Sequence, residues 1–354
     1  MTALFWVLQI YNVCRLTSAS LNINRMKKLS SNILFLPTLI ISFVLVSHIA
    51  IAQGNPVLTG ADPDAITVGK EYWIYPTNSL DTGTHRNTDR FYAYSSKDLT
   101  NWKNRGQLIQ IDEIPWIKDD SAKRHALWAP DVLEHNGKFY LYYAVGPQNP
   151  TPSRIGVAIS SSPSHGFKDV GRPLLTGGNG FEAIDPTVFI DPKTGIAYLY
   201  AGGSSGAKLR VFQLKSNLTE IDHEISIAQP PMFTEGVFMH ERNGIYYLSY
   251  SHGRWNDASY SVHYATAISP VGPWVYRGAI LVSDSTHKGP GHHSFVENPS
   301  THQWFIVYHR WENTGNGPFS GTRKTAIEPI FYRPDGTIMP VKMSDKNKLT
   351  SPIN

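Results

Sequence analysis

The sequence predicts an all-β protein that folds as one five-bladed β-propeller, and three observations support this prediction. Short runs of β-branched and aromatic residues alternate with Gly, Pro, Asn and Asp clusters throughout residues 53–354. No stretch there keeps a 3.6-residue apolar period over a dozen residues, so long amphipathic helices are not expected. One strand pattern returns five times, with starts 68, 58, 49 and 58 residues apart. A two-sheet sandwich would use similar strands, but it would not explain this recurrence.

Recurring strand patterns predict each of the five blades. A strand rich in Tyr and other large apolar residues recurs at 69–75, 137–143, 195–200, 244–250 and 302–308. A second pattern, which looks like an outer strand with its turn, follows the first four copies at 93–102, 158–163, 214–218 and 265–274. Ahead of each copy, another strand begins with polar residues beside Pro or Gly, at 61–64, 128–131, 184–187, 234–236 and 291–294. Because a single blade cannot bury both of its faces, five such units are expected to stack around an axis.

The N-terminal segment has the pattern of an export signal. Residues 26–52 begin with Met and two Lys, continue with a long apolar stretch and end in Ala-Ile-Ala, so a signal peptide cleaved after Ala52 is expected. An uncleaved anchor is the alternative, because the apolar run of 33–52 is almost long enough to span a bilayer. Residues 1–25 fit no part of a signal peptide and are expected to precede the true start at Met26. The expected mature domain is 53–354, periplasmic or secreted and without a stable membrane anchor.

Charge and cysteine content exclude several classes. The chain has 32 Lys+Arg and 28 Asp+Glu, but four of the basic residues and none of the acidic ones lie in residues 1–52. The remaining body is therefore neutral, which argues against a nucleic-acid partner, since nucleic-acid affinity comes mainly from phosphate neutralisation. The only cysteine is Cys14, so the body forms neither a disulfide nor a Cys-based zinc site. We expect a monomer.

Ionisable residues recur where the first strand of each unit begins. If the units are equivalent, four carboxylates and a histidine converge at one mouth of the propeller: Asp62, Asp131, Asp185, Glu235 and His292. Clustered like charges destabilise a fold, so chemistry explains the set better than structure does. Two carboxyl groups, one protonated and one ionised, are the groups that hydrolyse glycosidic bonds. A single Asp-Pro pair, such as Asp191-Pro192, is better explained as a turn.

These motifs resemble those of glycoside hydrolase family 43 over residues 55–341. The matching segments are GADPD at 60–64, LWAPDV at 127–132, AIDPTVF at 183–189, FTEGVF at 233–238, GPGHHSF at 289–295 and VYHR at 307–310. The resemblance implies a five-bladed propeller that hydrolyses plant polysaccharides containing arabinose and xylose. It also implies that Asp62 is the general base, that Glu235 is the general acid, and that Asp185 orients Glu235 and raises its pKa. Inversion at the anomeric carbon would require Asp62 and Glu235 to lie about 6.5–9.5 Å apart.

The resemblance extends to binding residues. His292 matches a family histidine that often contacts a hydrated calcium ion on the axis; any such ion would be structural, because the chemistry requires no cofactor. Arg323 occupies a position that often binds sugar hydroxyls, while Trp128, Phe181 and Trp255 are expected to shape the sugar pocket. The alternatives are packing between blades for Trp128 and a purely structural role for His292. Asp131 and Arg310 are expected to be scaffold residues.

The sequence therefore predicts an exo-acting, inverting glycosidase that releases arabinofuranosyl or xylosyl units, with α-L-arabinofuranosidase ahead of β-xylosidase. The long loops at 77–90 and 108–125 are expected to decide between exo and endo action. The alternatives are an endo-arabinanase, a galactan-directed enzyme or a non-catalytic sugar-binding propeller. A propeller enzyme acting on fructosyl sugars is disfavoured because Asp62 follows Ala rather than Asn. The G-x-S-x-G match at 202–206 is interpreted as a hairpin loop, because a nucleophilic serine needs a strand-to-helix turn.

Overall fold

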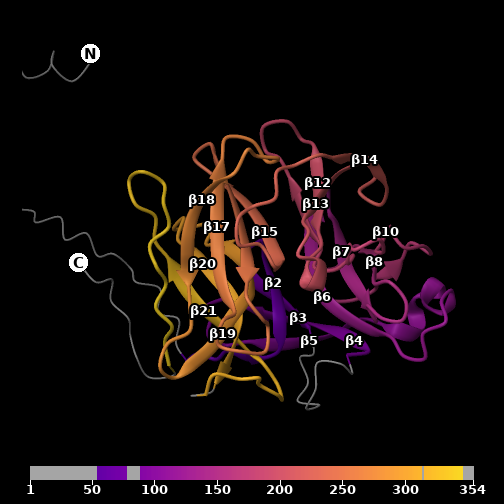
Figure 1. Ribbon diagram of the computed structural model, residues 1–354, viewed down its shortest axis with the longest axis horizontal. Helices are drawn as coiled ribbons and strands as arrows, with labels where there is room; N and C mark the ends of the chain where they lie inside the picture. Colours follow the sequence, from indigo (N-terminus) through magenta and orange to yellow (C-terminus); the bar gives the residue numbers. More distant parts are fainter. Residues whose placement is uncertain (1–53, 78–87, 313–314, 346–354) are drawn as a thin grey trace, which may run out of the picture. The chain divides into compact units, whose positions relative to one another are not determined.

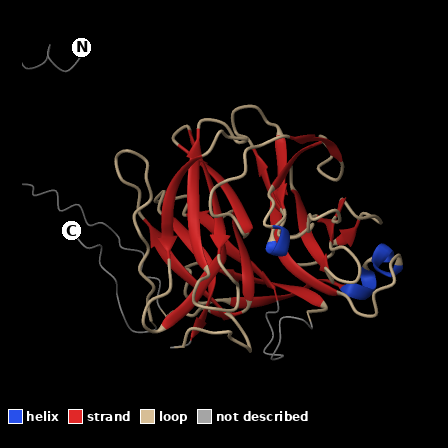
Figure 2. Cartoon of the chain, in the orientation of Figure 1, coloured by secondary structure: helices blue, strands red, loops and turns tan. Residues whose placement is uncertain are grey.

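Five antiparallel sheets form a ring of blades, which confirms the predicted five-bladed β-propeller (Figure 1, Figure 2). This computed structural model describes residues 54–77, 88–312 and 315–345. The expected extension 1–25, the signal peptide 26–52 and most of the 77–90 loop lie outside the described residues. None of the helices in the described part has the length and apolar character needed to cross a membrane.

Blades one to three follow one another along the chain. Blade one consists of β2 (Ala61–Val68), β3 (Glu71–Thr77), β4 (Arg90–Ser96) and β5 (Lys103–Gln110). Blade two consists of β6 (Ala126–His135), β7 (Lys138–Gly146), β8 (Arg154–Ser160), β9 (Lys168–Asp169) and β10 (Leu175–Thr176), the last two both paired with β8. Blade three consists of β11 (Thr187–Ile190), β12 (Ala197–Ala201), β13 (Arg210–Leu214) and β14 (Ile221–Ile225).

The last two blades close the ring. Blade four consists of β15 (Glu235–Arg242), β16 (Ile245–His252), β17 (Ser261–Ala267) and β18 (Val275–Leu281). Blade five takes β19 (His287–Glu297), β20 (Trp304–Glu312) and β21 (Lys324–Ile330) from the end of the chain and β1 (Leu58–Thr59) from its beginning. The side chain of Asn55 reinforces this closure: its Nδ2 donates to the carbonyl of Ile327 at 2.8 Å and its Oδ1 accepts from the amide of Ile327 at 2.9 Å.

Short 3-10 helices occur only in loops of the described chain. They are η2 (Ile111–Glu113), η3 (Pro115–Lys118) and η4 (Ser204–Gly206). Trp116 and Ile117 of η3 are buried in the core shared by blades one and two. Much of the 108–125 loop is therefore anchored by packing.

Tyrosine hydroxyls link each of the first four blades to the blade that follows it. The recurring tyrosines donate to main-chain carbonyls in the turn after the third strand of the next blade: Tyr75 to Pro163 at 3.1 Å, Tyr142 to Leu218 at 2.8 Å, Tyr200 to Pro270 at 2.6 Å and Tyr247 to Gly336 at 2.7 Å. The first repeated sequence pattern thus supplies the hydroxyl donors. Three of the four carbonyl acceptors lie at the end of the second pattern or in its turn. Because these tyrosines are buried, the hydroxyl must find such a partner.

The inner strands surround the axis, and the backbone of each is irregular at one position. β2 packs against β6 and β19, β11 against β6 and β15, and β15 against β19. One residue within or just before each inner strand has a left-handed backbone: Asp62 (φ 44°), Ala129 (45°), Asp185 (51°), Gly236 (61°) and His292 (37°). In four blades the register with the second strand also shifts there, as in a β-bulge. This repeated kink defines equivalent positions in the five blades.

Candidate active site

A cavity of about 580 Å³ lies beside the kinked positions of the inner strands and is lined by residues from all five blades. That volume is in the usual range for a small-molecule site. The predicted residues that line it are Asp62, Trp128, Asp185, Glu235, Trp255, His292 and Arg323. Asp62, Asp185 and His292 all occupy the kinked position of their blades, so the same local backbone turn brings them to the axis.

Asp131 is not part of this convergence, which corrects the expectation of four carboxylates at the mouth. It lies two residues beyond the kink and is therefore equivalent to Asp64, not to Asp62. Its Oδ1 accepts from the hydroxyl of Thr187 at 2.8 Å and its Oδ2 from the amide of Val188 at 3.0 Å. Asp64 accepts from the amide of Val132 at 2.8 Å in the same way. Both carboxyl groups join neighbouring inner strands, in agreement with the scaffold role expected for Asp131.

Asp62 is held as an anion. Arg323 Nη1 lies 2.8 Å from its Oδ1, while the Nδ1 atoms of His309 and His292 lie 3.3 and 3.4 Å from the same oxygen. Burial alone would raise the pKa of Asp62, but the positive charge of Arg323, with smaller contributions from His292 and His309, outweighs it and holds that pKa well below its usual range. A buried carboxylate that stays ionised at neutral pH is suited to accept a proton.

Glu235, in contrast to Asp62, is held in its protonated form. It begins β15 one residue before the kink, and its Oε1 accepts a hydrogen bond from the hydroxyl of Tyr260 at 2.8 Å. Burial raises the pKa of Glu235 to about 7, with a further contribution from the charge of Asp62, although the Tyr260 hydrogen bond acts in the other direction. Glu235 therefore carries a proton through much of the range in which Asp62 is ionised. Two carboxyl groups with divergent pKa values are the pattern of an acid and a base.

Asp185 connects the other groups of the site. Its Oδ2 accepts from the amide of Gly236 at 3.0 Å and lies 3.5 Å from Nδ1 of His292. Burial raises the pKa of Asp185 well above its usual range, and the charges of Glu235 and Asp62 add to this effect. The bond to Gly236 fixes the backbone that carries Glu235, which is a direct way to orient that side chain.

The surroundings of His292 offer few ligands for the expected calcium ion. His292 Nδ1 faces two carboxylates that already have other partners, and calcium prefers a shell of several oxygen ligands. Within the described ranges, the group of three His, Asp or Glu side chains with metal-ligand spacing lies elsewhere and does not include His292. The residues thus do not fit a calcium ion held by protein oxygens, and the hydrated ion expected from the sequence stays a prediction.

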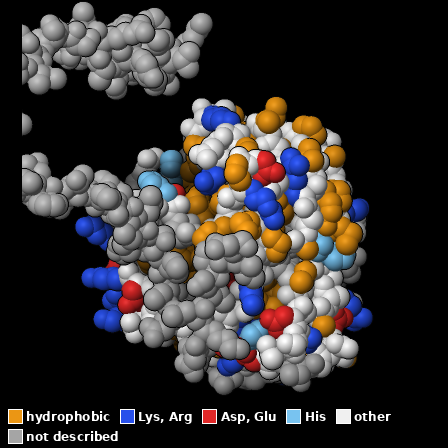
Figure 3. Space-filling view, turned by 90° about the vertical axis from the view of Figure 1, so that its left-hand side faces the viewer, with side chains coloured by type: hydrophobic (Ala, Val, Ile, Leu, Met, Phe, Trp, Pro, Cys, Tyr) orange, Lys and Arg blue, Asp and Glu red, His pale blue; other side chains and the backbone are white. Residues whose placement is uncertain are grey.

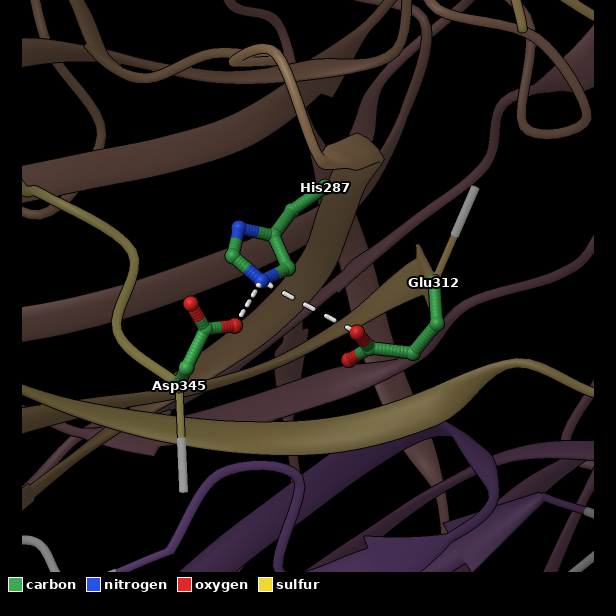
Figure 4. A group of neighbouring side chains, drawn as sticks. All are labelled: His287, Glu312 and Asp345. Carbon is green, nitrogen blue, oxygen red and sulfur yellow. Dashed lines mark hydrogen bonds and ion pairs between the residues drawn. The ribbon is translucent and has the colours of Figure 1, made fainter. Parts of the chain in front are cut away.

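That other group ties the C-terminal segment to blade five. Figure 4 shows Nε2 of His287 facing the carboxylates of both Asp345 and Glu312, at 2.7 Å from Asp345 and 3.8 Å from Glu312. On the opposite side of the ring, Nδ1 lies 3.0 Å from Asp284. All three carboxylates are therefore polar partners of the His287 ring.

Three of the four predicted sugar-contacting residues line the cavity, and one does not. Trp128 lies against the backbone of Gly146, where a Cβ would come within 2.0 Å of the indole ring. Arg323 is sandwiched between Asp62 and the ring of Trp255, with its guanidinium 5.3 Å from the ring centre. Phe181 is absent from the cavity lining; its ring is buried beneath the guanidinium of Arg210 at 4.7 Å.

Several lining residues were not identified from the sequence. Arg124 and His125 reach the cavity from the 108–125 loop, so that loop does border the site as expected. Gln148 comes from the loop after β7, and Ser204 comes from the 202–206 loop. That loop does connect β12 and β13 as a hairpin, yet it also packs against the site. A Cβ at Gly203, where φ is 152°, would lie 2.4 Å from Cβ of Glu235.

On the face shown in Figure 3, acidic and basic side chains are interspersed. This mixture of charges is in keeping with the neutral composition of residues 53–354.

An ionised and a protonated carboxyl group in one axial cavity are the groups that glycoside hydrolysis requires, which indicates the class of glycoside hydrolases. The family model for glycosyl hydrolases family 43 matches residues 53–338. The chain belongs to glycosyl hydrolase family 43, which confirms the resemblance found in the sequence.

Known relatives carry several specificities. The chain is 35% identical to a β-D-galactofuranosidase of Aspergillus niger, over 82% of this chain and 85% of that protein. It is 28% identical to a xylosidase/arabinosidase of Humicola insolens, over 81% of this chain and 99% of that protein. Among solved structures, an α-L-arabinofuranosidase from Clostridium thermocellum superposes with a TM-score of 0.61 at 30% identity, covering 79% of this chain and 93% of that one.

Proposed function

We propose that this protein is an exo-acting, inverting glycosidase that releases α-L-arabinofuranosyl or β-xylosyl units from plant cell-wall polysaccharides, with the arabinofuranosyl unit preferred. One observation carries the proposal: a single cavity holds Asp62, whose pKa is low, and Glu235, whose pKa is about 7. In this mechanism Asp62 takes a proton from the attacking water while Glu235 gives its proton to the departing glycosidic oxygen. Asp185 orients Glu235 through the amide of Gly236.

A second candidate substrate is a β-D-galactofuranoside, and the similarity to a galactofuranosidase favours it. α-L-Arabinofuranose and β-D-galactofuranose share the configuration of their ring carbons. They differ by one additional hydroxylated carbon on the exocyclic arm, so one pocket can accept both if it has room for that arm. Endo-arabinanase action remains the alternative if the cavity proves to be an open groove.

The direct test is hydrolysis of the nitrophenyl glycosides of α-L-arabinofuranose, β-D-xylopyranose and β-D-galactofuranose, together with arabinan and xylan. Cleavage of the first glycoside, with single sugars released from the polymer, is expected. Glu235→Gln should lose about 10²–10⁴-fold in rate on the polymer. Glu134→Gln, on the exposed part of β6, is the matched control and should keep full activity. The proposal fails if the wild type cleaves none of these substrates.

The stereochemistry has its own test. Proton NMR during the first turnovers should show the inverted anomer. Appearance of the retained anomer first would exclude Asp62 as a base that activates water.

We also propose that the mature protein begins after Ala52, acts in the periplasm or outside the cell, and works as a monomer without a stable membrane anchor. The lysines and the apolar stretch of residues 26–52 support export. N-terminal sequencing of protein secreted by an expressing cell tests the cleavage site. Light scattering tests the monomer, and equilibration with a chelator tests for the hydrated calcium ion.

A further inference from the structure

Two buried aromatic rings lie between the residues assigned as acid and base. Tyr260, directly before β17, donates its hydroxyl proton to Oε1 of Glu235 at 2.8 Å. His309, on β20, accepts at Nδ1 from the backbone amide of Asp62 at 3.1 Å. The two rings are stacked, with centroids 5.6 Å apart and planes inclined by 11°. A continuous chain of contacts therefore runs from Glu235 through Tyr260 and His309 to Asp62.

Close packing prevents this chain from shifting. Neither Tyr260 nor His309 has any exposed surface. The ring of Tyr260 lies so close to Gly291 that a Cβ there would be 2.1 Å from a ring carbon. On another side, the backbone of Gly203 lies against Cβ and Cα of Glu235. Because glycine occupies both contacts, the ring and the carboxyl group are held with almost no free space around them.

The stack is also electrically neutral. Burial, together with the nearby charge of Arg323, lowers the pKa of His309 to about 3, and burial raises the pKa of Tyr260 well above its usual range. Neither ring changes charge between pH 5 and 9. The stack can therefore hold the two carboxyl groups in place without taking part in proton transfer.

Tyr260 differs from the other buried tyrosines of the propeller. Those that link neighbouring blades donate to main-chain carbonyls in turns, as Tyr142 and Tyr200 do. Tyr260 donates instead to a carboxyl group that lines the cavity. Tyr143 and Tyr246 also donate to carboxyl groups, those of Asp169 and Asp191, but neither of these carboxyl groups lines the cavity.

We propose that Tyr260 and His309 are positioning residues, which together act as a rigid spacer that fixes the distance and orientation of Glu235 relative to Asp62. The proposal rests on the acid and base roles given above. Separation of the two carboxyl groups decides whether a water molecule fits between the base and the sugar, so a fixed spacer maintains the stereochemical outcome.

The test is Tyr260→Phe, which keeps the stacked ring and removes only the hydroxyl. Its matched control is Tyr250→Phe in the same blade, where the lost hydroxyl is equally buried and donates to the carbonyl of Pro231 at 2.6 Å. kcat/KM is measured on a glycoside with a poor leaving group and on a dinitrophenyl glycoside of the same sugar, which needs no acid. Thermal unfolding is followed in parallel.

Tyr260→Phe should lose about 10–100-fold on the poor leaving group, since small misplacements of a catalytic group cost up to about 10²-fold. On the dinitrophenyl glycoside it should stay within about threefold of the wild type, because bond cleavage there does not depend on general-acid catalysis. The hydroxyl favours the ionised form of Glu235, so its removal should also move the alkaline limb of the pH profile to higher pH. Tyr250→Phe should leave both rates and the limb unchanged.

His309 gives an independent signature. His309→Gln removes the ring beside Tyr260 and disturbs Asp62, whose action is needed whatever the leaving group. It should therefore slow both glycosides to a similar extent. If that variant does not fold, the Tyr260→Phe result stands alone as the test.

The proposal is overturned if Tyr260→Phe keeps the wild-type rate on the poor leaving group. It is equally overturned if both glycosides slow together while the unfolding temperature falls further than in Tyr250→Phe, because that pattern marks a structural role. Failure of the proposed function is a different result, namely a wild-type protein that cleaves neither glycoside.

Discussion

Replacing Glu235 with Gln should make the protein more stable at alkaline pH while it removes the proton donor. The side chain is buried, and burial raises its pKa from 4.5 to about 7. Gln has nearly the same shape and retains an oxygen that can accept from Tyr260. The substitution therefore removes an ionisable group from a site where its charged form is disfavoured, without opening a cavity.

The magnitude follows from the two pKa values. Below pH 4.5 the carboxyl group is protonated in both the folded and the unfolded chain, so it contributes no pH dependence. Between pH 4.5 and 7 the unfolded chain loses the proton while the folded protein keeps it, and folding stability falls. Above pH 7 the loss is complete, and a pKa difference of this size corresponds to about 3 kcal/mol.

Urea unfolding at pH 4.5 and pH 8.5 measures this effect. Between the two conditions, the wild type should lose about 3 kcal/mol more stability than Glu235→Gln. Glu134→Gln, on an exposed part of β6, should lose as much as the wild type. If Glu235→Gln and the wild type lose the same amount, the carboxyl group is not held protonated by its burial, and the acid assignment loses its physical basis.

Three further predictions concern the neighbours of these groups. Gly203→Ala should reduce kcat/KM about 100-fold or more, because its Cβ would lie 2.4 Å from Cβ of Glu235 at a backbone φ of 152°. Activity within threefold of the wild type would show that the loop moves to accommodate the methyl group without displacing Glu235. Arg323→Met should move the acidic limb of the pH–activity profile to higher pH, because burial then raises the pKa of Asp62 with less opposing charge. If the limb does not move, the pKa of Asp62 does not determine its position. Asn55→Ala should lower the free energy of unfolding, measured with urea, by about 3 kcal/mol, because it removes both side-chain bonds to the backbone of Ile327 in blade five. A loss below about 1 kcal/mol would mean that the pairing of β1 with β21 closes the ring without Asn55.

Much of the fold was predictable because its units repeat. The recurrence of one strand pattern indicates stacked units, whatever the details of each strand. The resemblance to glycoside hydrolase family 43 implied the same five-bladed propeller. Closure of the ring was not predictable in this way. Blade five takes its outer strand from β1, only two residues long, and such a short segment carries no recognisable strand pattern.

The site was predictable to a lesser degree. The motifs identified Asp62, Asp185 and Glu235, but the expectation that Asp131 joins them was wrong, because Asp131 lies two residues beyond the kink. That offset depends on a left-handed backbone at Ala129, a residue that rarely adopts such a conformation.

The sequence by itself determined the repeated architecture and the identity of the acidic residues, because periodicity and motifs are properties of the chain order. Tertiary structure alone decided which groups face one another. Tyr260 and His309 lie 49 residues apart, and His309 lies 247 residues from Asp62, yet packing places all of them beside one cavity. Burial and neighbouring charge then separate the pKa values of Asp62 and Glu235, and neither effect exists until the blades have closed around the axis.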